Sequence, residues 1–146
     1  MSSTRLETVT AALRTVETQD FTALAAFLAP TFVYQMRPLS CAHAAGYTGE
    51  GKATKEQFLD FIKRYPSMIP TLKFADEPLR VVEGPDSLLY HTTSAGVRVD
   101  GKPYANEYSM LYQFDKESGL IVELVEMIDS AAFLGVLSDS SGAAKE

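Results

Sequence analysis

The chain changes its hydrophobic period part-way along, and this change constrains the fold more than any other feature. From Leu72 onward four strand-like runs follow one another, separated by turn sequences; they are Leu72–Val82, Ser87–Val99, Tyr104–Phe114 and Leu120–Ile128. Asp100-Gly101 between the second and third runs is a strong hairpin signal, because glycine tolerates the positive φ of a tight turn. Pro78 interrupts the first run, which indicates a sheet edge or a bulge there. The second half therefore predicts an antiparallel meander.

The N-terminal segment has the three- and four-residue spacing of apolar side chains that indicates helices. One stripe is made of Leu6, Val9, Leu13 and Val16. Thr4 with Glu7 fits a capping box for this helix, because the hydroxyl and the carboxylate satisfy free N–H groups reciprocally. Asp20 is a suitable N-cap for a second helix, which Pro30 ends. We therefore expect two consecutive helices whose apolar faces need a surface to cover.

Between these helices and the meander we expect a strand, a loop and a third helix. Phe32–Met36 has the composition of a short strand, and Pro38–Lys52 is a loop rich in Gly, Ala and Ser. Thr54 with Gln57 fits the capping box of a helix that continues until Pro66 stops it.

A last short helix over Ser130–Leu137 precedes a polar tail, Ser138–Glu146, which has little to bury and is predicted to be disordered. A chain of 146 residues fits one domain, and we find no internal repeat or linker, so residues 1–137 are predicted to form it. Helices followed by an antiparallel meander are typical of the α+β class.

The strand-like runs alternate imperfectly between apolar and polar residues. Leu88, Leu89 and Tyr90 are consecutive, as are Leu124 and Val125. Apolar residues on both faces predict that both sides of the sheet are covered, one by helices and a pocket, the other by a second copy of the chain. We therefore expect a homodimer formed through the outer face of the sheet.

The composition excludes several classes of partner. Thirteen Lys and Arg against 19 Asp and Glu give a net charge of −6 without a basic cluster, which disfavours nucleic acid and anionic membrane surfaces. We find neither a bilayer-spanning apolar stretch nor the pattern of a signal peptide. The single Cys41 makes the reducing cytoplasm the expected compartment. His43 and His91 are the only histidines, and no zinc-like spacing exists.

Three short motifs carry a family resemblance: Tyr104–Tyr108 (YANEY), Gly119–Ile121 (GLI) and Glu126–Ser130 (EMIDS). The segment Gln35–Ser40 adds a fourth. In their order and content these segments resemble the SnoaL-like proteins of the nuclear transport factor 2-like superfamily. They are most similar to the fungal subgroup of natural-product (polyketide and meroterpenoid) isomerases and cyclases. Leu120 for the usual Lys and Met127 for the usual aromatic residue are departures from this pattern.

This resemblance covers nearly the whole chain and implies a cone, in which one curved antiparallel sheet wraps around the N-terminal helices and encloses a pocket. It implies a cofactor-independent acid–base enzyme, an isomerase, cyclase or dehydratase acting on a polyketide- or terpenoid-like intermediate. The superfamily also contains proteins without catalysis, so a ligand-binding or assembly module is the alternative. Epoxide hydrolysis, with water held between a carboxylate and Arg or Asn, is a third possibility.

Two carboxylates are candidates for the base. In SnoaL-like enzymes a carboxylate at the end of the last strand, where Asp129 stands, is similar in place to the general acid/base. Asp129 is equally suited to cap the helix that begins at Ser130. Glu126 lies three residues earlier, so on a regular strand it points to the opposite face, and only one of the two lines the pocket unless a bulge intervenes. We expect Asp129 or Glu126 to act as base, with His91 as proton shuttle or as a buried neutral side chain.

The remaining candidates would bind or orient the substrate. If Tyr108 faces inward, then Asn106, Met110 and Tyr112 do too, as pocket wall or as plain core, and Glu107 faces outward. An open pocket of several hundred cubic ångströms that reaches a carboxylate would favour the enzyme, and a solid core the module.

Two segments near the expected mouth of the cone offer further contacts. Gln35 and Arg37 alternate out of the first strand, and Arg37 could hold a carboxylate or enolate or form a surface ion pair. His43 and Tyr47 belong to the loop over 38–52, which is either a lid on the pocket or simply mobile.

Overall fold

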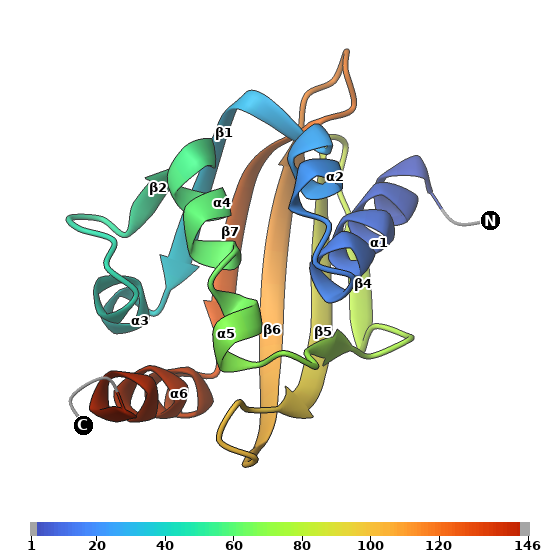
Figure 1. Cartoon of the computed structure of the whole chain (residues 1–146). Coiled ribbons are helices and arrows are strands. Elements are labelled where there is room, and N and C mark those ends of the chain that lie inside the picture. The colour runs from blue at the N-terminus through green and yellow to red at the C-terminus, as the bar shows by residue number, and fades with distance from the viewer. Residues whose placement is uncertain (1–2, 144–146) are drawn as a thin grey trace.

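The helices cover one face of a single curved sheet in the computed structural model, which describes residues 3–143 (Figure 1). The helices are α1 Thr4–Glu17, α2 Phe21–Ala26, α3 Leu39–Ala44, α4 Lys55–Ile62, α5 Tyr65–Met68 and α6 Ser130–Ala143. The strands are β1 Leu28–Arg37, β2 Lys52–Thr54, β3 Lys73–Phe74, β4 Arg80–Glu83, β5 Ser87–Val97, β6 Pro103–Phe114 and β7 Ile121–Ile128. None of the helices within residues 3–143 is long and apolar enough to cross a bilayer.

The sheet has the strand order β2-β1-β7-β6-β5-β3, with β4 paired to β5 beside β3. It does not close into a barrel, and the predicted α+β class is confirmed. The expectation of a purely antiparallel sheet is wrong at one place, because β1 pairs with β7 in parallel. Parallel neighbours need a long connection, and residues 38–120, more than half of the chain, lie between these two strands.

The hairpin predicted at Asp100-Gly101 is confirmed. Strands β5 and β6 pair in register from Ser87 with Gln113 to Val97 with Pro103, and Gly101 in the turn has φ +85°. Pro78 falls between β3 and β4, so the predicted run breaks there into two short strands that pair with different parts of β5. Pro78, which has no backbone N–H group, therefore lies where the sheet makes no hydrogen bond between strands.

The helix boundaries differ from the predicted ones mainly where local turns intervene. Ser3, not Thr4, is the N-cap of α1, and its hydroxyl accepts a hydrogen bond from the Leu6 N–H (3.0 Å). The capping box of Thr54 and Gln57 on α4 is confirmed. The segment predicted as loop contains α3 and β2. The third helix, α4, already ends at Ile62, and Pro66, which was expected to stop it, lies in the first turn of α5.

The C-terminal helix is longer than the pattern predicts. It runs to Ala143, so residues 138–143 of the expected disordered tail are helical, while residues 144–146 lie outside the described residues. Asp139 forms an ion pair with Arg98 (2.7 Å) in the β5–β6 turn and lies 3.7 Å from Lys102. These contacts hold the additional part of α6 against the β5–β6 turn. They join segments that are distant in the sequence, so the local composition of the tail does not predict them.

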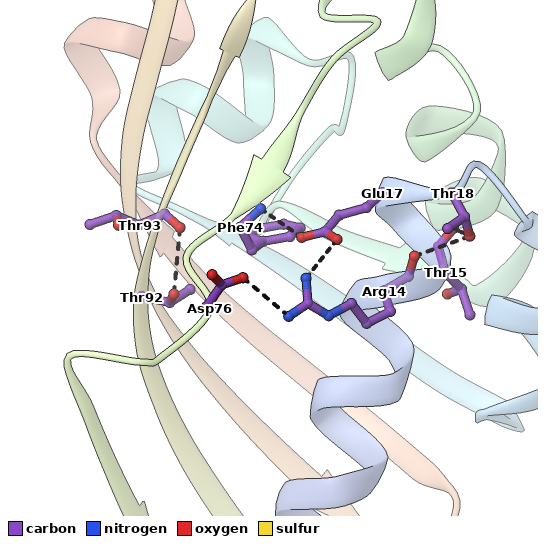
Figure 2. A network of polar contacts seen from close by, with 8 residues as sticks. All are labelled: Arg14, Thr15, Glu17, Thr18, Phe74, Asp76, Thr92 and Thr93. Carbon is purple, nitrogen blue, oxygen red and sulfur yellow. Dashed lines mark hydrogen bonds and ion pairs between the residues drawn. The ribbon is translucent and has the colours of Figure 1, made fainter.

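A polar network fixes α1 against the edge of the sheet (Figure 2). Arg14 pairs with Glu17 (2.9 Å) and with Asp76 (3.6 Å). Glu17 also accepts a hydrogen bond from the backbone N–H of Phe74 (2.8 Å), so it ties the end of α1 to β3. Because Val16 and Phe74 both line the interior cavity described below, this network holds one rim of that cavity in place.

Strand alternation gives the sheet two chemically different faces. On β5 and β6 the buried inner-face residues are Leu88, Tyr90, Thr92, Ser94, Tyr104, Asn106, Tyr108, Met110, Tyr112 and Phe114. Their neighbours, such as Leu89, His91, Glu107 and Leu111, face outward. The structure contains one chain, so the expectation that a second copy covers this outer face stays a prediction.

Candidate active site

A cavity lies between the helices and the inner face of the sheet. Its wall is almost entirely apolar or aromatic, with contributions from Leu13, Phe32, Phe58, Phe61, Leu72 and Phe74 among others. The cavity volume is about 60 Å³. This is smaller than the several hundred cubic ångströms expected of an enzyme pocket, but the cavity reaches a carboxylate. Glu126 is the one carboxylate in this wall among the described residues.

A β-bulge turns Glu126 inward. Ile121 pairs with Phe114, but the next pair is Glu123 with Gln113, so β7 contains one residue more than β6 over this stretch. The extra residue, Val122, shifts the alternation of every later position. Glu126 therefore shares the inner face with its partner Met110. Without the bulge, the opposite set of β7 side chains would face the cavity.

The Glu126 carboxyl group lies in surroundings that favour its neutral form. Burial raises its pKa from 4.5 to about 7, and the hydrogen bond that the Tyr34 hydroxyl donates to Oε1 (3.1 Å) opposes this shift in part. No ion pair found within residues 3–143 includes Glu126. A carboxyl group with a pKa near neutrality is able both to accept and to release a proton at physiological pH.

Four tyrosines, Tyr34, Tyr65, Tyr108 and Tyr112, line the same cavity as this carboxyl group, and Tyr34 contacts it directly. Burial raises the pKa of each phenol, so all four stay protonated and keep an O–H group that is able to donate a hydrogen bond. Tyr108 shares a hydrogen bond with Ser94 (2.8 Å), whereas the Tyr112 hydroxyl donates only to the weak acceptor Met110 Sδ (3.2 Å).

The structure brings three of the candidate binding residues to the cavity, since Tyr108, Met110 and Tyr112 line it. Asn106 is buried on the same face of β6 but lies outside the cavity wall. Its Nδ2 donates to the Tyr104 hydroxyl (2.7 Å), and its Oδ1 accepts from the backbone N–H groups of Glu107 (2.7 Å) and Asp129 (3.0 Å). Asn106 thus joins the end of β6 to the end of β7.

Asp129 is exposed and stands outside the cavity. Its Oδ1 accepts a hydrogen bond from the backbone N–H of Ala131 (3.0 Å), so the side chain caps α6. His91 and Glu107 lie on the outer face of neighbouring strands, where His91 Nε2 is 3.2 Å from Glu107 Oε1. The structure therefore places Glu126 in the cavity and separates it from both Asp129 and His91.

Gln35 and Arg37 also lie on the outer face. Gln35 donates to Glu123 (3.4 Å), and Arg37 donates to Gln35 (3.4 Å). The buried positions of β1 are Tyr34 and Met36, which alternate with these two. Sequence reasoning missed Tyr34, although the alternation of apolar and polar residues along β1 contains the signal that would have identified it.

The remaining two candidates are His43, in the last turn of α3, and Tyr47, which follows that helix. His43 Nε2 lies 2.9 Å from the Gly49 carbonyl oxygen and links the two ends of the segment over 43–49. Tyr47 is only 8% exposed and packs into the interior instead of covering it from outside. Within residues 3–143, no group of His, Cys, Asp and Glu side chains is placed to hold a metal ion.

A narrow cleft continues the cavity between α1 and the α4–α5 region. The cleft shares Val16, Ile62 and Leu72 with the cavity and extends to Gln19 and Pro70. The Gln19 side-chain amide donates to the Pro70 carbonyl oxygen (3.3 Å) across this cleft. Access from solvent therefore depends on side chains that bridge two separate segments.

Residues 9–124 match the SnoaL-like domain family, which is most of the chain. The chain belongs to this family. Solved structures agree with this SnoaL-like assignment: IdmH, a putative polyketide cyclase from Streptomyces antibioticus, superposes with a TM-score of 0.75 at 16% identity over 93% of this chain and 99% of that one. A putative isomerase from Bacillus subtilis has a TM-score of 0.67 at 21% identity, covering 90% and 93% of the two chains.

AusH from Aspergillus nidulans, with a TM-score of 0.69 at 18% identity, covers 88% of each chain. No curated protein sequence matches this SnoaL-like chain significantly. Similarities at these identities show the fold and leave the reaction to be argued from the site.

Proposed function

We propose that this SnoaL-like protein is a cofactor-independent enzyme that transfers a proton on a small apolar substrate, with Glu126 as general acid and base. One observation carries the proposal: a carboxyl group with a pKa of about 7 lies in an apolar cavity, hydrogen-bonded to a buried phenol. Near neutral pH both protonation states of Glu126 are populated, so the same group removes a proton at one carbon and returns it at another atom.

Tyr34 orients this group. Its hydroxyl group holds Oε1, so Oε2 is the oxygen left to act on the substrate. Isomerisation, cyclisation and dehydration all need such a transfer, and the apolar wall holds a flexible carbon skeleton close to the carboxyl group. Tyr108, Met110 and Tyr112 form part of this wall and would contact the substrate.

We assign the base to Glu126 and not to Asp129, because the Asp129 side chain caps α6 outside the cavity. His91, Gln35, Arg37 and Glu107 are on the outer face and have no part in this assignment. Asn106 supports the strand ends without reaching the cavity wall.

Among substrates, the apolar and aromatic wall favours a polyketide- or terpenoid-like intermediate, and a fungal natural-product pathway is the most specific form of this proposal. The similarity to IdmH and AusH is consistent with it. A molecule of that size would need the side chains around the narrow cleft, Val16, Ile62 and Leu72, to move apart. Such movement at a pocket opening is common on substrate binding.

The experiment is base-catalysed opening of 5-nitrobenzisoxazole, a reaction that needs only one base in an apolar site. The base removes the C3 proton, the nitrile forms, the N–O bond breaks and the electron pair leaves on the phenolate oxygen, which is yellow. Glu126→Gln should lower the rate by about 10²-fold or more. The rate should rise with pH through about 7, because only the carboxylate form accepts a proton.

Glu107→Gln and Asp129→Asn are matched controls, since each removes a carboxylate outside the cavity, and both should keep the wild-type rate. Equal rates in wild type and Glu126→Gln would end the proposal. The small cavity volume favours the alternative, a ligand-binding or assembly module, and that alternative predicts no turnover that depends on Glu126. Epoxide hydrolysis gains no support, because Arg37 and Asn106 lie outside the cavity that contains Glu126.

We also propose that the protein is a homodimer through the outer face of the sheet. Met127 is 53% exposed there, beside the apolar side chains Leu111 and Val125 of the same face. Light scattering should give twice the 16.0 kDa mass of one chain, and a 16.0 kDa particle at micromolar concentration would contradict this.

A further inference from the structure

The narrow cleft beside α1 leads from solvent to the cavity. Gln19 and Pro70, at its outer end, are exposed. Val16, Ile62 and Leu72, which line both the cleft and the cavity, are half-buried. In Figure 1, α1 and α2 lie on one side of this route and α4 and α5 on the other. The cleft has a volume of about 10 Å³, against about 60 Å³ for the cavity, so the cleft limits what enters.

The segment that carries Pro70 is held firmly against β5. The Thr71 hydroxyl oxygen accepts a hydrogen bond from the Val97 N–H (2.8 Å). A Cβ atom on Gly96 would lie 3.0 Å from the Thr71 carbonyl oxygen, so the two backbones are in close contact. This side of the cleft therefore has little room to move.

The opposite side, between α1 and α2, is also fixed on both flanks of Gln19. Before it, Glu17 accepts a hydrogen bond from the Phe74 N–H (2.8 Å) and ties the end of α1 to β3. After it, the Asp20 side chain accepts from the Ala23 N–H (3.0 Å) and caps α2. The contact across the cleft comes from the Gln19 side chain, which donates to the Pro70 carbonyl oxygen (3.3 Å). The part that is able to move is therefore this side chain.

The backbone conformation of Gln19 indicates that its side chain has a role of its own. Gln19 has φ +59°, and within residues 3–143 it is the one residue other than glycine with a positive φ. Gly and Asn adopt this conformation at lower cost, so the turn between the helices does not require Gln. Such conformations are frequent at ligand clamps and switch regions. What Gln supplies here is a donor long enough to reach Pro70.

A second small pocket adjoins the cavity on the other side of α1 and shares Phe74 with it. The charged network of Figure 2 lines that pocket. The Glu17 carboxylate, which is 12% exposed, accepts from both Arg14 (2.9 Å) and the Phe74 N–H (2.8 Å). Hydrogen bonds to a charged group are roughly twice as strong as neutral ones. The cleft that one neutral contact of Gln19 closes is therefore the easier route to open.

We infer that the Gln19 side chain is a gate on the cavity: its hydrogen bond to the Pro70 carbonyl oxygen closes the cleft, and its rotation admits an uncharged, apolar molecule. Both groups are exposed, so water replaces the broken hydrogen bond and opening costs little. Gln19 is not part of the cavity wall, so the gate controls the rates of binding and release and leaves the affinity unchanged. The inference holds whether or not Glu126 acts as a base.

The probe is N-phenyl-1-naphthylamine, a neutral apolar compound whose fluorescence rises in apolar surroundings, followed by stopped-flow mixing. Gln19→Asn keeps a residue that tolerates positive φ but is one methylene too short to reach Pro70. In this variant the association and dissociation rate constants should both rise roughly three- to tenfold, with the same Kd as wild type. The urea midpoint of unfolding should stay the same, whereas a merely structural role of Gln19 would lower the midpoint and leave the rate constants unchanged.

Asp76→Asn is the matched control, because it removes one contact at the second pocket, the ion pair with Arg14 (3.6 Å). Both rate constants should stay at their wild-type values. In the opposite direction, Gln19→Cys combined with Pro70→Cys allows a short dithiol-reactive linker to hold the cleft closed. Association of the probe should then slow at least about tenfold and recover when a reductant releases the linker. Cys41 is 0% exposed and does not compete for the linker.

Four results would overturn the inference: wild-type rate constants in Gln19→Asn, unchanged association in the linked double variant, faster binding in Asp76→Asn, or no saturable binding of the probe in any variant. These outcomes are separate from those of the proposed function. Rates that depend on Gln19 without turnover that depends on Glu126 would leave the gate and remove the enzyme. Turnover that depends on Glu126 with rates that ignore Gln19 would leave the base and remove the gate.

Discussion

Both faces of the sheet carry ionisable side chains, but the surroundings of these side chains differ between the two faces. On the outer face His91 contacts Glu107, and in a separate group Gln35 contacts both Glu123 and Arg37. All of these side chains are at least partly exposed. On the inner face Glu126 has apolar and phenolic neighbours and a pKa of about 7. Solvent screening makes surface ion pairs weak, whereas burial changes the protonation of a single carboxyl group strongly. The proposed proton transfer therefore uses the face with fewer charges.

The sorting of residues between these faces depends on one extra residue. Glu123 and Glu126 are three positions apart, and the bulge at Val122 decides which of them faces the cavity. The bulge reverses every later position on β7, so it acts on Asp129 as well. Glu126 and Asp129 are three positions apart and face opposite sides in either register, so the extra residue decides that Glu126 is the inner one.

The largest effect expected from this comparison is on the pH dependence of stability. The pKa of Glu126 is about 7 in the folded protein and 4.5 in the unfolded chain. Its contribution to stability is therefore fully present below pH 4.5 and is lost as the pH rises through 7. The difference between the two pKa values corresponds to about 3 kcal/mol.

Glu126→Gln is neutral at every pH and removes this dependence. Relative to wild type, its free energy of unfolding should rise by about 3 kcal/mol between pH 4 and pH 8, as measured by urea denaturation. Glu107→Gln on the outer face should show no such rise. If the two variants respond to pH alike, the inner carboxyl group is not desolvated and the contrast between the faces fails.

Asn106 tests whether the inner face also depends on neutral polar groups. Asn106→Ala removes the hydrogen bonds that Asn106 makes with the Tyr104 hydroxyl and with the backbone N–H groups of Glu107 and Asp129, although the Asp129 N–H keeps the Glu107 carbonyl oxygen (3.1 Å) as acceptor. We expect a loss of about 2 kcal/mol in the free energy of unfolding, because these groups stay buried or partly buried. Gln113→Ala, at a half-buried outer-face position of the same strand, should cost less than about 0.5 kcal/mol. Equal losses would show that burial of the amide is not what matters.

Much of the fold follows from local patterns in the sequence. The change of hydrophobic period, the glycine turn at Gly101 and the capping box at Thr54 are all signals within a few residues, and the structure contains each of them. The parallel pairing of β1 with β7 and the extension of α6 through Asp139 depend on contacts between distant segments. No local pattern encodes those contacts.

The residues of the candidate site were harder to predict from the sequence than the fold. The alternation along β6 indicates which of its residues share a face, because that strand is regular until Gln113. On β7, two pairs of adjacent apolar residues hide the bulge, so the choice between Glu126 and Asp129 stayed open. Tyr34 was not identified as a site residue, and Tyr47 was assigned to a surface loop. Aromatic side chains in a strand or a loop do not by themselves indicate burial next to a carboxyl group.

Asp129 lies between the end of β7 and the start of α6. Substitutions of Asp129 therefore test whether this carboxylate belongs to the cavity or only caps the helix. Asp129→Ala should lower the free energy of unfolding by about 1 kcal/mol, since the α6 N-terminus loses the acceptor for the Ala131 N–H. Asp129→Ser keeps a capping oxygen and should recover most of this loss. If Asp129→Ser lowers the turnover of 5-nitrobenzisoxazole without changing the free energy of unfolding, Asp129 becomes a candidate base again.

The smallest effect should come from the outer-face pair of His91 and Glu107. The 3.2 Å contact lies at the surface, with about a third of the His91 side chain and more than half of the Glu107 side chain exposed (32% and 58%). Screening and side-chain entropy limit such pairs, so a double-mutant cycle with His91→Ala and Glu107→Ala should give a coupling energy below about 1 kcal/mol. This coupling should shrink further in 1 M salt, where the Debye length is about 3 Å. The weak coupling expected here places the pair outside the surface that the proposed homodimer covers. A larger coupling that persists in high salt would place the pair inside that interface, where water is excluded.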